Sequence, residues 1–260
     1  MAEILFWPAL LFYGEAAVGY LGYLRRAGAA DRAAIWGVRL GWLAQTALLV
    51  VQAERENGFP WGTWAGSLNL FVWLVVTVYL GVRKPYRLLG LAVMPLAAAL
   101  LIVSRAGGGT GAGSRSHYSN VFLALHVGLV LAAFAGFTLA AAVSAFYLWQ
   151  ERRLKRREVT ILRRRAPSLA TLDRLASRTV LFSLPALTLG LAVGLVRLLV
   201  DHDRIDAVVV ATLATWVVWS AYVVLRATRG WTGRRAAYVA LIGFALVIVV
   251  RLAIPAAHFS

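Results

Sequence analysis

The fold is decided by residues 119–150, which read SNVFLALHVGLVLAAFAGFTLAAAVSAFYLWQ and contain no Lys, Arg, Asp or Glu. A helix of about 32 residues extends roughly 48 Å, which exceeds the ~30 Å hydrocarbon core of a bilayer. A basic run follows at once, from Arg152 to Arg157. The stretch therefore predicts a membrane helix whose basic carboxyl end continues beyond the bilayer.

The composition of the whole chain agrees with this stretch. Of 260 residues, 61% are apolar and 15% are charged, and the mean hydropathy is +0.74. A soluble chain of this size cannot bury so much apolar surface, so the solvent must be lipid. Disorder and collagen are excluded. The absence of cysteine excludes disulfides, thiolate catalysis, iron–sulfur clusters and zinc sites with Cys ligands.

Seven further stretches are long and apolar enough to be membrane helices. We therefore predict an all-α polytopic membrane helix bundle, in which residues 1–260 form a single transmembrane domain. No cleavable signal peptide is expected, because the first span lacks a basic n-region and a small-residue cleavage site. The eight expected spans are about 4–24, 33–53, 63–82, 86–104, 119–150, 179–200, 206–227 and 234–255.

The distribution of Lys and Arg predicts the orientation. One side of the expected bundle receives 21 of the 27 basic residues, including the segment 151–178. That side is cytoplasmic by the positive-inside rule, so both termini are extracytoplasmic. The net charge of +16 then reflects topology and attraction to anionic lipid at the cytoplasmic face, not nucleic-acid binding. A bacterial cytoplasmic (inner) membrane is the expected location.

The four histidines, His117, His126, His202 and His258, all fall on or near the expected outer face. His126 lies inside an apolar helix, where an ionisable residue is a functional candidate by default. Imidazole without cysteine suits a metal ion or a haem iron with axial histidines. The alternative for His126 is a hydrogen bond between helices, and His117 and His202 are expected in exposed loops.

Two arginines near the outer ends of spans, Arg197 and Arg251, could pair with haem propionates, because guanidinium matches carboxylate geometry. Alternatively, both simply extend to the interface. Trp61 and Trp64 open the third span, as an aromatic belt or as a surface that stacks on a porphyrin.

A carboxylate and a guanidinium occur at comparable depth in the first two spans. Glu15 lies near the middle of the first span and Arg39 lies inside the second. Burying a lone carboxylate in lipid is costly. We expect a structural Glu15–Arg39 pair in preference to a proton relay.

Several segments, in order and spacing, resemble the cytochrome c assembly protein family (CcsA/CcmC/HemX-like) over about residues 58–260. Leu125-His126-Val127 is similar to the helix with the first external histidine of the family, and Ala257-His258-Phe259-Ser260 occupies the place of the second. The other similar segments are Gly58–Leu68, Leu148–Lys155, Ser168–Leu175, Thr215-Trp216, Ser220-Ala221-Tyr222 and Arg229–Ala236.

The resemblance implies that His126 and His258 are axial ligands of haem b. By its spacing to Thr215-Trp216, Asp206 stands where the family has an aspartate in a tryptophan-rich external segment. Here the preceding residues 201–205 contain no tryptophan, and no Pro-Lys follows. This departure weakens the case for cytochrome c synthetase activity more than the case for haem binding. It favours the small eight-span HemX-like branch of the family.

We therefore expect a haem-handling membrane protein of c-type cytochrome biogenesis. It would bind haem b, stably or transiently, at an outward-facing site and present it to a membrane partner subunit. It would be an assembly factor more than a self-sufficient enzyme. The competing hypothesis is a cofactor-free membrane scaffold or regulatory subunit that acts through its basic cytoplasmic segments. A transporter is disfavoured, because no broken spans are repeated between the halves.

Overall fold

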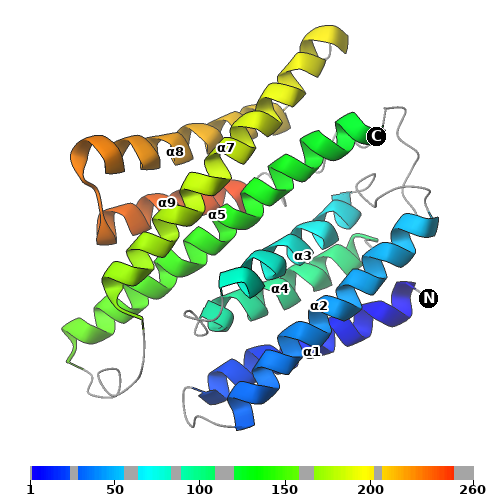
Figure 1. The fold of residues 1–260 in the computed structure, drawn as a ribbon, viewed down its shortest axis with the longest axis horizontal. Helices are drawn as coiled ribbons and strands as arrows, with labels where there is room; N and C mark the ends of the chain where they lie inside the picture. Colours follow the sequence, from blue (N-terminus) through cyan, green and yellow to red (C-terminus); the bar gives the residue numbers. More distant parts are fainter. Residues whose placement is uncertain are drawn as a thin grey trace. The chain divides into compact units, whose positions relative to one another are not determined.

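The computed structural model describes residues 2–23, 29–55, 64–82, 89–108, 120–157, 167–201 and 207–248, and the regular structure in these ranges is helical throughout. This confirms the all-α prediction. The helices, drawn in Figure 1, are α1 (Ala2–Tyr23), α2 (Ala29–Arg55), α3 (Trp64–Val82), α4 (Gly90–Ala106), α5 (Asn120–Lys155), α7 (Leu169–Asp201), α8 (Ala207–Arg229) and α9 (Gly233–Ile248).

Five of these helices are long and apolar enough to cross a membrane. The candidate segments are Ile4–Gly22, Arg32–Glu54, Leu125–Lys155, Leu169–Val196 and Val209–Arg229. Two shorter apolar helices, Ala65–Gly81 and Gly90–Ala106, correspond to the predicted third and fourth spans. The last part of the predicted eighth span, residues 249–255, lies outside the described residues. The chain is therefore a multi-pass membrane protein.

The predicted long helix around residues 119–150 is confirmed as α5, which continues to Lys155. The helix α7 differs from its prediction, because it begins at Leu169 and not near residue 179. Ser168 caps it: its hydroxyl accepts a hydrogen bond from the backbone N–H of Thr171 at 3.2 Å. Arg174 lowers the apolar character of this first part, so hydropathy alone places the start too late.

The helices fall into two groups, each described by itself: α1 to α4, and α5, α7, α8 and α9. In the first group, small residues bring α1 and α2 close together. A Cβ atom at Gly19 would lie 2.9 Å from that of Ala34, and one at Gly41 would lie 2.7 Å from the ring of Tyr13. Such close approach is the usual way in which membrane helices gain packing energy.

The predicted Glu15–Arg39 pair is wrong. Both residues are exposed, and no ion pair joins them among the described side chains. The guanidinium of Arg39 lies over the Trp36 ring instead, 5.3 Å from the ring centroid. Equal depth in two neighbouring helices is therefore not enough to bring two side chains together, and both of these point outward.

A chain of buried polar side chains links α1, α2 and α3. The Tyr13 hydroxyl donates to the Gln45 side-chain oxygen at 2.7 Å. The Gln45 amide donates to Asn69 Oδ1 at 2.8 Å, and the Asn69 amide donates to Gln52 Oε1 at 3.2 Å. All four side chains are buried. Their mutual hydrogen bonds offset the cost of removing polar groups from water.

In the second group, Trp219 of α8 is fully buried between neighbouring helices. Its ring stacks on Phe137 of α5 with centroids 4.2 Å apart, and a Cβ atom at Gly243 of α9 would lie 2.7 Å from it. Away from their basic ends, α7 and α8 expose large apolar side chains: Phe182 is 82% exposed and Val217 is 56% exposed. Such surfaces are stable when lipid covers them.

Candidate functional site

The structure describes the side chain of one predicted site residue, His126. Trp64 and Arg197 belong to α3 and α7, but their side chains lie outside the described part of the chain. The remaining predicted residues also lie outside it: His258, Arg251, Asp206 and Trp61. The predicted ligand set therefore stays a prediction, and the geometry of the site begins from His126.

His126 lies in α5 and its imidazole contacts α7. Its Nδ1 atom lies 2.8 Å from the carbonyl oxygen of Gly190. A carbonyl oxygen only accepts hydrogen bonds, so Nδ1 carries the proton and donates it. In the neutral ring, Nε2 is then the nitrogen with the lone pair. Histidines that bind metals usually have this arrangement, because the hydrogen bond at one nitrogen orients the ring and makes the other a better ligand.

Two glycines of α7 make room for the imidazole. A Cβ atom at Gly194 would lie 2.6 Å from Cε1 of His126 and 3.0 Å from Nδ1. One at Gly190 would lie 2.8 Å from Val130 of α5. Glycines four residues apart lie on one face of a helix, so they form a slot for α5 and its histidine. The Gly190–Gly194 spacing is a small-residue packing pattern that was visible in the sequence and that the sequence analysis missed.

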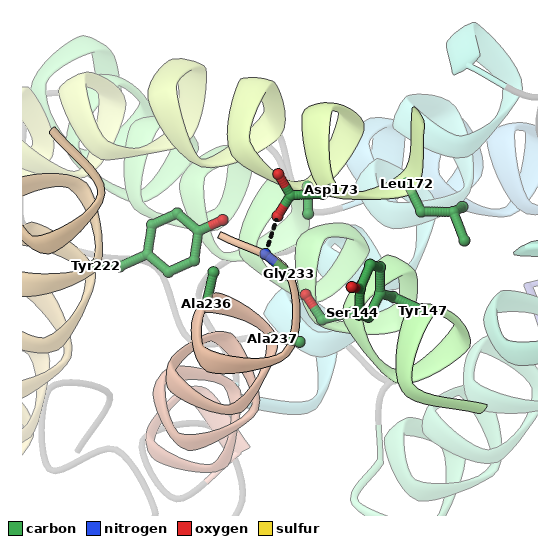
Figure 2. A pocket seen from close by; sticks show the side chains of 9 residues that line it. Ser144, Tyr147, Leu172, Asp173, Tyr222, Gly233, Ala236 and Ala237 are labelled. Atoms are coloured by element: carbon green, nitrogen blue, oxygen red, sulfur yellow. Dashed lines mark hydrogen bonds between the residues drawn. The ribbon is translucent and has the colours of Figure 1, made fainter. Parts of the chain in front are cut away.

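A second polar cluster, also missed in the sequence, lies where α7, α8 and α9 meet. Asp173 of α7 accepts hydrogen bonds from both terminal nitrogens of Arg226 of α8. It also accepts one from the backbone N–H of Gly233 at 2.9 Å, drawn in Figure 2. Gly233 has a φ of +61°, a left-handed conformation that favours glycine. One carboxylate thus joins three helices.

The same region contains a small pocket (Figure 2), formed by side chains of α5, α7, α8 and α9 around Asp173. Its lining residues are Ser144, Tyr147, Leu172, Asp173, Ala176, Tyr222, Gly233, Ala236 and Ala237. Asp173 already has three donors, so this cluster is a structural junction more than a ligand site. In the described ranges, no group of three or more His, Cys, Asp or Glu side chains could hold a metal ion.

These observations define a class of protein: a multi-pass membrane helix bundle in which a histidine is oriented by a neighbouring helix. Residues 61–256 match the cytochrome C assembly protein family. Because this match covers most of the chain, the protein belongs to that family, which confirms the resemblance seen in the sequence.

Individual relatives agree with the family. The chain is 30% identical to Protein HemX of Brevibacillus brevis over 158 residues, which cover 60% of this chain and 58% of HemX. It is 38% identical to the cytochrome c biogenesis protein CcsA of Guillardia theta over 89 residues, or 33% and 30% of the two chains. A CcsA of Gloeobacter violaceus is 23% identical over 274 residues, covering 82% of this chain and 80% of that protein.

The chain thus spans little more than half of HemX, and less than a third of the Guillardia CcsA. No solved structure matches it.

Proposed function

We propose that this protein handles haem in c-type cytochrome biogenesis: it binds haem b at an outward-facing site and presents it to a membrane partner subunit. In this proposal the chain forms one transmembrane domain of eight spans with both termini extracytoplasmic. It lies in the bacterial cytoplasmic membrane, with a family-like core over about residues 58–260. Membership of the cytochrome c assembly family and the apolar helices support it.

The observation that carries the proposal is the geometry of His126. An imidazole whose Nδ1 donates to the Gly190 carbonyl has its lone pair on Nε2, the atom that an axial ligand offers to a haem iron. Gly194 leaves room for the ring beside α7, and the hydrogen bond to Gly190 orients it. On this test His126 fits the role of an axial ligand.

The roles that we propose for the remaining site residues come from the sequence alone. His258 would be the second axial ligand, Arg197 and Arg251 would pair with the propionates, and Asp206, Trp61 and Trp64 would line the site. The haem and the apocytochrome would supply the reacting carbons and cysteines. The protein would bind and orient the haem, so an assembly factor fits better than a self-sufficient enzyme.

The alternative is a cofactor-free scaffold or regulatory subunit that acts through its basic cytoplasmic segments. The exposed arginines at the end of α5, including Arg152, Arg156 and Arg157, favour it. An acidic partner protein would be its ligand. If the folded protein takes up no haem, this alternative is favoured over haem handling.

The test is the reduced-minus-oxidised absorption spectrum of protein purified in mild detergent. We expect a bis-histidine haem b spectrum that is lost in His126→Ala and in His258→Ala, because each removes one axial ligand. His202→Ala is the matched control and should keep the spectrum. Folded wild-type protein that contains no haem and takes up none when it is added would contradict the proposal.

A further inference from the structure

The helix α7 runs beside α5 (Figure 1), and one of its faces contacts α5 at two levels. A Cβ atom at Gly136 of α5 would lie 3.2 Å from that of Ser183 on α7. One at Gly190 of α7 would lie 3.4 Å from the Cβ atom of Leu129 on α5. The carbonyl oxygen of Gly190 is also the partner of His126. The position of α7 at residue 190 therefore decides whether the imidazole keeps its acceptor.

The opposite face of α7 contains two residues that bend helices, Pro185 and Thr188. Both are exposed. At 3.6 residues per turn, Pro185 lies roughly 140–160° round the helix from Gly190 and Ser183. A proline inside a helix has no N–H to donate, and its ring crowds the carbonyl four residues earlier, so the helix opens on that side and bends away from it. The Thr188 hydroxyl donates to the Leu184 carbonyl at 2.9 Å, a bond that also bends helices.

Trp216 of α8 holds Thr188 from the neighbouring helix. Its indole N–H donates to the Thr188 hydroxyl oxygen at 2.9 Å. The first helix group contains the same arrangement, since Trp73 of α3 donates to the Thr46 hydroxyl oxygen of α2 at 2.8 Å. Thr46 donates in turn to the carbonyl four residues earlier, but α2 contains no proline. The chain thus provides its own control for the contact at Thr188.

We propose that Pro185, Thr188 and Trp216 are positioning residues for His126. They bend the carboxyl-terminal half of α7 toward α5 and hold it there, which brings the Gly190 carbonyl to Nδ1 of the imidazole. A ligand ring fixed by its second nitrogen binds a metal better. This inference rests on the proposed function only for the role of His126. Neither of its tests requires bound haem, so the two proposals can fail separately.

The first test is disulfide formation between α5 and α7 in membranes treated with an oxidant, because the chain has no other cysteine. Leu129→Cys/Gly190→Cys joins the helices beyond the proline, and Gly136→Cys/Ser183→Cys joins them before it. The Cβ separations of 3.4 and 3.2 Å are close to those of disulfides. Pro185→Ala should slow the first cross-link about fivefold and leave the second within about twofold, because only the segment beyond the proline moves.

The matched control for this test is Pro95→Ala, since Pro95 is also exposed and lies inside a helix, α4. It should change neither cross-link. Alanine favours a helix more than proline does, so Pro185→Ala should fold. An unchanged first cross-link in Pro185→Ala, or equal slowing of both cross-links, would overturn the positioning role.

The second test observes the hydrogen bond of His126 by NMR of the imidazole nitrogens, in haem-free, histidine-labelled protein in detergent. His126→Ala identifies the signal. Thr188→Val removes the hydroxyl and should shift the tautomer ratio about fivefold away from the Nδ1–H form, as expected for loss of one hydrogen bond. Trp216→Phe should shift it in the same direction. Thr188→Ser keeps the hydroxyl and should keep the ratio, and Thr46→Val should leave it unchanged.

Two results of the second test would contradict the proposal. One is an unchanged ratio in Thr188→Val, and the other is an equal shift in Thr46→Val. Protein that shows the expected shifts but takes up no haem would support the positioning of His126 and overturn only the proposed function.

Discussion

At the residue scale, the decisive feature is the fit between an imidazole and two glycines. The ring of His126 occupies space that any larger residue at position 194 would fill, because a Cβ atom there would lie 2.6 Å from Cε1. Real Cβ atoms do not approach other atoms so closely, so the ring or α7 would have to move. Interiors that are already well packed respond to added atoms by strain.

Gly194→Ala should therefore destabilise the protein by about 1–3 kcal/mol. If haem is bound as proposed, the same change should shift or abolish its absorption bands, because the axial ring is displaced. Thermal unfolding in detergent and the absorption spectrum measure the two effects. Gly128→Ala is the matched control, since nothing lies within 4 Å of its added Cβ atom. Equal effects of both substitutions would contradict a slot specific to His126.

The sequence allowed His126 to be singled out, but not its partner. An ionisable residue in an apolar stretch is visible without a structure. The acceptor at Gly190 is a backbone carbonyl 64 residues away, and every residue has such a group, so no side-chain pattern marks it. The Glu15–Arg39 prediction failed for a related reason: equal depth in two helices does not fix which faces meet.

At the scale of elements, Asp173 holds the ends of three helices together. Its side chain is 14% exposed and that of Arg226 is 21% exposed, so the pair is largely shielded from water. Removing one member of a shielded pair leaves the other charge without a partner, and this is costlier than losing an exposed pair.

Asp173→Ala should lower the free energy of unfolding by about 2 kcal/mol, through loss of its bonds to Arg226 and to Gly233. Glu151→Ala is the control: it breaks a pair with Lys155, whose side chain is 63% exposed, and should cost roughly 0.5 kcal/mol or less. Denaturant unfolding in detergent measures both. A larger loss in the control would contradict the role of Asp173 as a junction.

Most helices could be predicted from hydropathy, and the errors are instructive. The span expected at 179–200 proved to be the apolar part of a helix that begins at Leu169. Its first turns contain Arg174 and Arg178 on the exposed side and Leu172 on the buried side. An amphipathic turn at a membrane surface scores poorly on hydropathy, although Ser168 supplies a standard helix start.

At the scale of the whole molecule, the proposed topology can be tested directly because the chain has no cysteine. A single introduced cysteine would be the only thiol to react. Arg156→Cys lies on the expected cytoplasmic side and Asp203→Cys in the expected outer loop. In intact cells a membrane-impermeant maleimide should label Asp203→Cys and not Arg156→Cys, and lysis should make both reactive. Labelling of Arg156→Cys in intact cells would contradict the orientation.

The hydrogen bond from His126 to a main-chain carbonyl has a mechanical consequence. No side-chain replacement can delete that acceptor, so point mutations cannot remove it directly. Sliding or turning α7 along α5, however, would carry the Gly190 oxygen away from Nδ1 and alter the electron density at Nε2. Any event that shifts α7 would therefore change how strongly Nε2 of His126 binds a metal ion. The position of α7 would thus control the affinity of this ligand.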